Sequence, residues 1–147
     1  MKVGTDSVLL GAWAKIAQAS SILDIGTGTG LLALMCAQRN RKAIIDAVEI
    51  NAEAALQASI NFKKSPWYNR LKCHSTSIQK FLNINPDYKY DTIISNPPYF
   101  EHHNSTSINS NARNTARTTH KLDFNFLIRT IKTALLPEGT ISIILPV

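Results

Sequence analysis

Short apolar runs alternate along the chain with longer segments in which apolar residues recur every three or four positions. The apolar runs predict strands at 21–25, 43–50, 71–74, 90–95 and 141–145, and the amphipathic segments predict helices at 31–40, 51–61 and 123–136. Such alternation is typical of α/β domains, in which right-handed crossovers join parallel strands. We therefore predict an α/β domain with a mostly parallel sheet and helices on both of its faces.

Residues suited to begin or end these elements stand next to several of them. Asn51 and Asp123 can cap the helices that follow them, Pro66 interrupts the chain before the third strand, and Gly139 precedes the last strand. We expect an opening helix after the N-cap candidates Thr5 and Asp6. Its buried face would carry Val8, Leu9, Leu10, Trp13, Ile16 and Ala17.

The length of the chain sets the number of domains. A chain of 147 residues fits one compact domain, so a single domain is predicted over residues 1–147. The sequence stops directly after its fifth predicted strand, which would leave an apolar sheet edge that a complete sheet covers or pairs. The domain is therefore expected to be truncated at its C-terminus.

Charge and cysteine content narrow the possible partners and compartment. The 16 Lys and Arg residues exceed the 10 Asp and Glu residues, and the resulting charge of +6 favours an anionic partner such as nucleic acid. Cys36 and Cys73 match neither a zinc nor a disulfide pattern, so we expect a reduced, cytoplasmic protein without a metal. The sequence has no apolar run of about 18 residues and no secretion signal, so no membrane association is expected. We infer no obligate protein partner.

A glycine-rich turn follows the first predicted strand. It comprises Asp24, Ile25, Gly26, Thr27, Gly28, Thr29 and Gly30, and it falls where parallel sheets bind their ligands, at the carboxyl end of a strand. Glu49 follows Gly30 by 19 residues, at the end of the second strand, where a carboxylate can accept hydrogen bonds from both ribose hydroxyls. Together they indicate a nucleoside-containing cofactor, whereas a glycine turn alone is more often only structural.

The spacing of the glycines argues against a dinucleotide. Pyrophosphate-binding loops have the spacing Gly-x-Gly-x-x-Gly, but here the glycines are spaced Gly-x-Gly-x-Gly and residue 31 is Leu. Asp24 would repel phosphates and suits the cationic end of S-adenosylmethionine. We therefore predict S-adenosyl-L-methionine as the cofactor, and a dehydrogenase is disfavoured.

The sequence Asn96-Pro97-Pro98-Tyr99 follows the fourth strand and is the candidate catalytic turn. The two prolines fix the backbone, so the Asn96 side-chain oxygen and the Pro97 carbonyl can accept hydrogen bonds from a planar amino group. Tyr99 can stack on a base and align its amine with the methyl donor. The alternative is a Pro-Pro turn that merely ends a strand.

These motifs resemble those of a known family. The glycine turn, Glu49 and residues 96–100 resemble the Rossmann-like class I methyltransferases that modify amino groups, and residues 2–13 look like those of the bacterial enzymes that methylate N6 of adenine-37 in valine tRNA. The resemblance implies that Thr5 and Asp6 fold over the methionine part of the cofactor and that Ile50 packs against its adenine. Ser77 stands where such enzymes commonly carry the Asp that binds the adenine amine. The family usually has a further segment before the first motif, so the N-terminus is also expected to be incomplete.

Residues 102–122 form a basic polar stretch after the catalytic turn. Arg113, Arg117, His120 and Lys121 lie in it without a single Asp or Glu, and we expect them to contact RNA phosphates. The alternative is a solvated loop with incidental charge.

The leading hypothesis is methylation of adenine N6 in RNA, in particular adenine-37 in the anticodon loop of valine tRNA, because loops offer unstacked bases. Duplex DNA stays possible as a substrate. The alternatives are N5-methylation of a glutamine in a protein such as a release factor, and a module that binds cofactor or RNA without catalysis.

Overall fold

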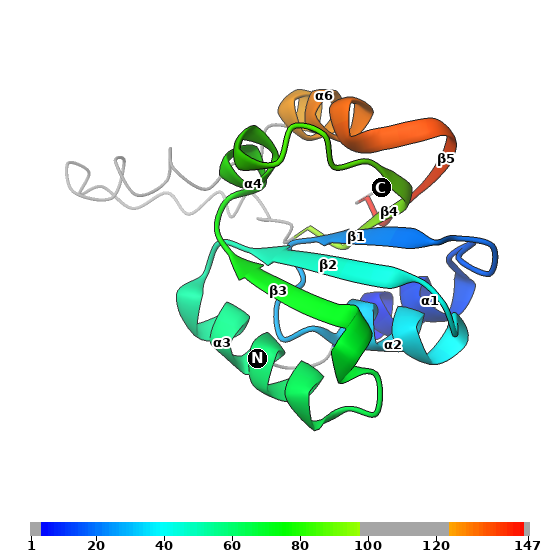
Figure 1. Cartoon of the computed structure of the whole chain (residues 1–147), viewed down its shortest axis with the longest axis vertical. Coiled ribbons are helices and arrows are strands. Elements are labelled where there is room, and N and C mark those ends of the chain that lie inside the picture. Colours follow the sequence, from blue (N-terminus) through cyan, green and yellow to red (C-terminus); the bar gives the residue numbers. More distant parts are fainter. Residues whose placement is uncertain (1–3, 98–123, 146–147) are drawn as a thin grey trace, which may run out of the picture.

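The computed structural model of the protein describes residues 4–97 and 124–145. Within this part, five strands form one parallel sheet in the order β3-β2-β1-β4-β5 (Figure 1). The strands are β1 Ser21–Ile25, β2 Ile44–Glu49, β3 Leu71–Ser75, β4 Tyr90–Ser95 and β5 Leu135–Ile143. The strand order reverses between β1 and β4, and the carboxyl ends of parallel strands at such a reversal are where ligands bind. Seven residues named above lie outside the described part: Pro98, Tyr99, Arg113, Arg117, His120, Lys121 and Asp123.

Helices cover both faces of the sheet, as the sequence predicted. Figure 1 shows α1, α2 and α3 on one face, with α4 and α6 on the other. The helices are α1 Thr5–Trp13, α2 Leu31–Arg39, α3 Ala52–Lys64, α4 Ile78–Ile84 and α6 Phe124–Ala134. None of the described helices is long and apolar enough to cross a membrane.

Each face of the sheet has its own apolar core. The core under α1, α2 and α3 includes Leu10, Ile22, Cys36, Ile45 and Phe62. The core under α4 and α6 includes Leu23, Val48, Phe81, Ile93 and Leu127. Both faces of the central strands β1 and β4 are therefore buried, which fits their mostly apolar sequences.

The opening helix differs from the prediction. α1 ends at Trp13, Gly4 occupies the N-cap without a side-chain hydrogen bond, and Thr5 and Asp6 lie in the first turn. The exposed fractions of Val8, Leu9 and Trp13 are 42, 61 and 71%, so their expected burial is wrong. The backbone leaves the helical conformation at Ala14, and the Arg39 side chain binds the carbonyl oxygens of Gly11 and Ala14 at this end of the helix.

One strand boundary and one helix also differ from the prediction. Leu135 pairs with Tyr90, so β5 begins six residues earlier than expected. The register then shifts, and regular pairing with β4 resumes where Thr140 pairs with Thr92. The two leucines at 135–136 fit a helix pattern equally well, which misled the sequence interpretation. The short helix α4 was not predicted at all. Asn51, in contrast, caps α3 as predicted, because its side-chain oxygen accepts a hydrogen bond from the Ala54 N–H at 2.9 Å.

Candidate functional site

The predicted cofactor and catalytic motifs meet at one edge of the sheet. Ile25 at the end of β1 pairs with Val48 in β2 and with Ser95 in β4. Glu49, one residue further, pairs with Ser75 at the end of β3. The glycine turn, Glu49, the segment before Ser77 and Asn96 therefore all follow neighbouring strand ends.

The glycine turn has a backbone that side chains rarely allow. Gly26, Gly28 and Gly30 have φ angles of +71°, +60° and +91°. At Gly30, which caps α2, a Cβ atom would lie 2.5 Å from Cε1 of Phe62, so both conformation and packing require glycine there. The Asn61 side chain donates a hydrogen bond to the Thr29 carbonyl at 2.9 Å and holds the turn from α3.

Asp24 is a fully buried acid beneath this turn. Its Oδ2 accepts a 2.6 Å hydrogen bond from the Thr27 hydroxyl, and its Oδ1 has no partner of ordinary hydrogen-bond geometry among the described residues. Burial raises the pKa of Asp24 to about 7. The Thr27 hydroxyl and the amide of Ala33 oppose that rise, and the Glu49 carboxylate adds to it. An unpaired buried carboxylate oxygen is suited to a cationic or hydrogen-bond-donating ligand.

Glu49 and Ile50 lie beside the glycine turn. Oε2 of Glu49 accepts a hydrogen bond from the Gly28 N–H at 2.8 Å, and Oε1 accepts one from the Asn51 N–H at 2.9 Å. Each carboxylate oxygen keeps a second acceptor site, so ribose hydroxyls can still bind. Ile50 is 70% exposed, which leaves an apolar surface next to the carboxylate.

Ser77 has a structural role that the sequence interpretation did not include. Its side-chain oxygen caps α4 by accepting a hydrogen bond from the Lys80 N–H at 3.2 Å. The preceding residue joins the candidate site, because the Thr76 N–H donates to the Glu49 carbonyl at 3.0 Å. A hydroxyl oxygen has a second acceptor position, so capping does not prevent Ser77 from binding a ligand.

Asn96 stands directly after β4 and contacts the first turn of α1. Its Nδ2 donates a hydrogen bond to the Ser7 hydroxyl oxygen at 2.8 Å, and both side chains are partly buried. Pro97 is buried and restricts the backbone of Asn96. No local sequence pattern indicates Ser7 or Asn61, because Ser7 is 89 residues from its partner and Asn61 is 32 residues from Thr29.

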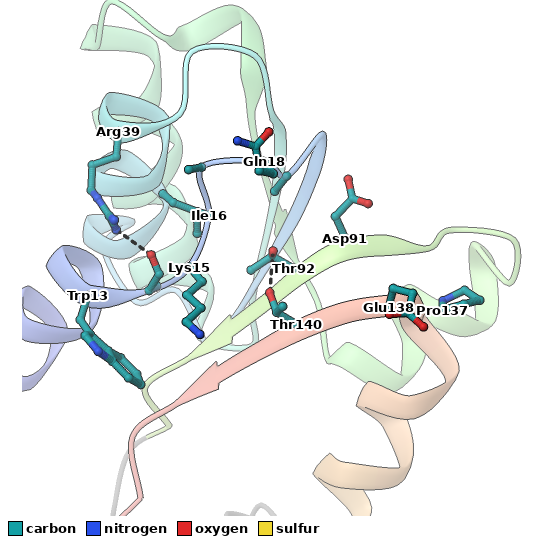
Figure 2. Close-up of a pocket in the computed structure, with 13 residues that line it drawn as sticks. Trp13, Lys15, Ile16, Gln18, Arg39, Asp91, Thr92, Pro137, Glu138 and Thr140 are labelled. Carbon is teal, nitrogen blue, oxygen red and sulfur yellow. Dashed lines mark hydrogen bonds between the residues drawn. The ribbon is translucent and has the colours of Figure 1, made fainter.

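A separate pocket of about 490 Å³ lies along the first halves of β4 and β5 (Figure 2). Residues 13–19 line one side, and Thr92 and Thr140 face each other across the two strands with their hydroxyl oxygens 3.1 Å apart. Parallel sheets bind ligands at the carboxyl ends of their strands, and this pocket is at the other end. None of the predicted site residues lines it. In the described residues, no group of three or more His, Cys, Asp or Glu side chains could hold a metal ion.

Solved structures share this fold. The glycopeptide N-methyltransferase MtfA aligns with a TM-score of 0.63 and 11% identity, covering 95% of this chain and 52% of that one. Coclaurine N-methyltransferase aligns with a TM-score of 0.65 and 18% identity, covering 94% of this chain and 34% of that one. These likenesses confirm the predicted Rossmann-like fold of class I methyltransferases.

Curated proteins are similar over almost the whole chain. The tRNA1(Val) (adenine(37)-N6)-methyltransferase of Parabacteroides distasonis is 49% identical over 148 residues, which are 99% of this chain and 60% of that protein. A protein of the same name from Aliivibrio fischeri strain ES114 is 50% identical over 147 residues, covering 100% of this chain and 61% of that protein. The chain thus spans about three fifths of the length of the curated relatives that it matches.

The sequence profile of one family covers nearly all of the domain, from the start of α1 to the end of β5. This profile, described as the methyltransferase small domain, matches residues 3–143. It includes the glycine turn, Glu49 and Asn96, on which the resemblance was based. The chain therefore belongs to the methyltransferase small domain family.

Proposed function

We propose that this domain transfers a methyl group from S-adenosyl-L-methionine to the exocyclic N6 of an adenine in RNA, namely adenine-37 of valine tRNA. The observation that carries the proposal is Asn96, whose carboxamide is fixed at the strand end beside the glycine turn. Curated relatives with 49% and 50% identity carry the name of that activity, which supports the choice of substrate.

The residues at the strand ends fit S-adenosylmethionine. The free Oδ1 of Asp24 matches the ammonium group of the cofactor, and the carboxylate of Glu49 matches its ribose hydroxyls. The exposed side chain of Ile50 offers an apolar surface for the adenine of the cofactor, and the Ser77 hydroxyl can accept a hydrogen bond from the adenine amine. Thr5 and Asp6, in the first turn of α1, cover the methionine part. Gly26, Gly28 and Gly30 let the backbone approach the ligand closely, and the Thr27 hydroxyl binds Oδ2 of Asp24 beneath the cofactor.

The remaining chemistry belongs to Asn96 and the turn that it begins. When bound, S-adenosylmethionine supplies an electrophilic methyl carbon on a positively charged sulfur. The Asn96 side-chain oxygen and the Pro97 carbonyl accept hydrogen bonds from the adenine amine, which favours the pyramidal geometry that frees its lone pair. By sequence, Pro98 is the second proline of the Asn-Pro-Pro-Tyr motif, and Tyr99 is proposed to stack on the base. Neither acceptor can keep a proton at neutral pH, so the proton released by the amine leaves to solvent.

An RNA substrate agrees with the charge of the chain. The formal charge of +6 attracts phosphates, and the stretch with Arg113, Arg117, His120 and Lys121 follows the catalytic turn in sequence. Anticodon loops present unstacked bases, which lowers the cost of moving an adenine into the site. A cytoplasmic location, where tRNA is found, is part of this proposal.

The proposal is tested by offering labelled S-adenosylmethionine and the full-length protein three acceptors side by side: unmodified tRNA, duplex DNA and a release factor. Label in tRNA is expected. Label only in the release factor would replace the proposal with glutamine methylation. Bound cofactor without label in any acceptor would indicate a module that binds without catalysis.

A further inference from the structure

We propose that Ser7 is a positioning residue that fixes the orientation of the Asn96 carboxamide. This inference rests on the proposed function of Asn96 as an acceptor for the substrate amine. The Ser7 hydroxyl oxygen accepts the hydrogen bond from Nδ2 of Asn96 at 2.8 Å. With its nitrogen directed toward α1, the carboxamide directs its oxygen away from α1.

The orientation matters because the two ends of a carboxamide have opposite hydrogen-bonding properties. The oxygen accepts hydrogen bonds, and the NH2 group only donates them. If the Asn96 side chain turned over, it would present donors to an amine whose own hydrogens are also donors. An Asn96 without a fixed partner could populate both orientations, and only one of them serves the reaction.

Ser7 can act as a fixed point because α1 is anchored independently of the site. Gly11 packs so closely on α2 that a Cβ atom there would lie 2.4 Å from the sulfur of Met35. Leu10 is buried in the core, and the Arg39 side chain holds the carbonyl oxygens of Gly11 and Ala14 at 2.7 and 3.0 Å. The first turn of α1 therefore has a set position relative to the sheet.

The backbone of Asn96 is anchored from the other side. The Ser95 hydroxyl donates to the Ile25 carbonyl at 2.8 Å, which joins the ends of β4 and β1. The Ile144 N–H donates to the Ser95 carbonyl at 3.3 Å, which joins β4 to the end of β5. With both backbones fixed, the Asn96 side-chain torsions are the remaining freedom, and the hydrogen bond to Ser7 restricts them.

The test compares Ser7→Ala, Ser7→Thr, Asn96→Ala and the double variant Ser7→Ala/Asn96→Ala in the full-length protein. Ser59→Ala is the matched control, because the Ser59 hydroxyl also lies on a helix and donates to the Ala55 carbonyl of its own helix, with no contact to Asn96. We expect Ser7→Ala to lower kcat for tRNA by about tenfold, the loss typical of one hydrogen bond. Cofactor affinity and Tm should stay near those of the control, and Ser7→Thr should keep most of the activity.

The double variant separates positioning from a direct role. If Ser7 acts through Asn96, its removal has no further effect once Asn96 is alanine. A full tenfold loss in that background, or unchanged kcat in Ser7→Ala, would overturn the inference.

A measurement without activity distinguishes this inference from the proposed function. In ¹⁵N NMR relaxation, the side-chain NH2 group of Asn96 should become more mobile in Ser7→Ala and stay rigid in Ser59→Ala. If the Asn96 side chain becomes mobile in Ser7→Ala but the wild type methylates no RNA, the proposed function is refuted and the positioning role of Ser7 is supported. Equal rigidity in both variants would refute the positioning and leave the function intact.

Discussion

Replacing Asp24 with asparagine should stabilise the folded domain at pH 8 and, at the same time, weaken the cofactor site. The carboxyl group is fully buried, one of its oxygens has no ordinary hydrogen-bond partner among the described residues, and its pKa is raised to about 7. Asparagine is similar in shape and can still accept the hydrogen bond from Thr27, but it carries no charge. The buried charge is thus removed with little change in packing.

The magnitude follows from the two pKa values of Asp24. The unfolded chain releases the proton near pH 3.8 and the folded chain near pH 7. Between these values the unfolded state binds fewer protons, so rising pH lowers the free energy of unfolding. One pH unit corresponds to about 1.4 kcal/mol, so the ionised carboxylate costs about 4 kcal/mol above pH 7. About 2 kcal/mol of this cost develops between pH 5 and pH 7, because the folded-state carboxyl is only half ionised at pH 7.

The assay is urea unfolding of the wild type and of Asp24→Asn at pH 5, 6, 7 and 8. The difference between the two proteins cancels the titration of all other groups. We expect the stability of the variant relative to the wild type to rise by about 2 kcal/mol from pH 5 to pH 7 and to level off near pH 8. A difference that is constant across this range would show that Asp24 ionises normally, and the argument from burial would be wrong.

Three further predictions concern the same edge of the sheet. As pH rises towards 7, the Kd for S-adenosylmethionine should fall by up to about tenfold per pH unit, and above pH 7 it should level off, because the cationic cofactor needs Asp24 ionised. A Kd that calorimetry finds to be independent of pH would contradict this. Asn96→Ala should lower turnover by about 100-fold with cofactor affinity nearly intact, and an equal loss of affinity would argue against a role confined to the methyl acceptor. Gly30→Ala should destabilise the domain by about 2 kcal/mol in urea unfolding, because its φ is +91° and Phe62 fills the space; unchanged stability would count against that strain.

The strands and the glycine turn could be predicted because their signals are local. Ser21–Ile25 is a short apolar run that ends at a glycine with positive φ, and Ile44–Glu49 repeats the pattern before a capping Asn51. Ligands of parallel sheets bind at the carboxyl ends of the strands, so the edge that carries Asp24, Glu49 and Asn96 could be inferred as well.

The remainder depends on contacts that no local pattern contains. The amphipathic signal near the N-terminus did not reveal that α1 ends at Trp13, because the hydrogen bonds from Arg39 that hold that end come from 25 and 28 residues away. α4 has only seven residues, too few for a clear helical period. The hydrogen bond between Ser7 and Asn96 exists only because the folded sheet brings the two together.

Methylation of adenine-37 is tested most directly with two transcripts of valine tRNA, one with adenine at position 37 and one with guanine there. Each is incubated with the full-length protein and S-adenosylmethionine, digested to nucleosides and analysed by mass spectrometry. We expect N6-methyladenosine from the first transcript and none from the second. Equal amounts from both would contradict the choice of position, and no methylated adenosine from either would contradict the proposed function.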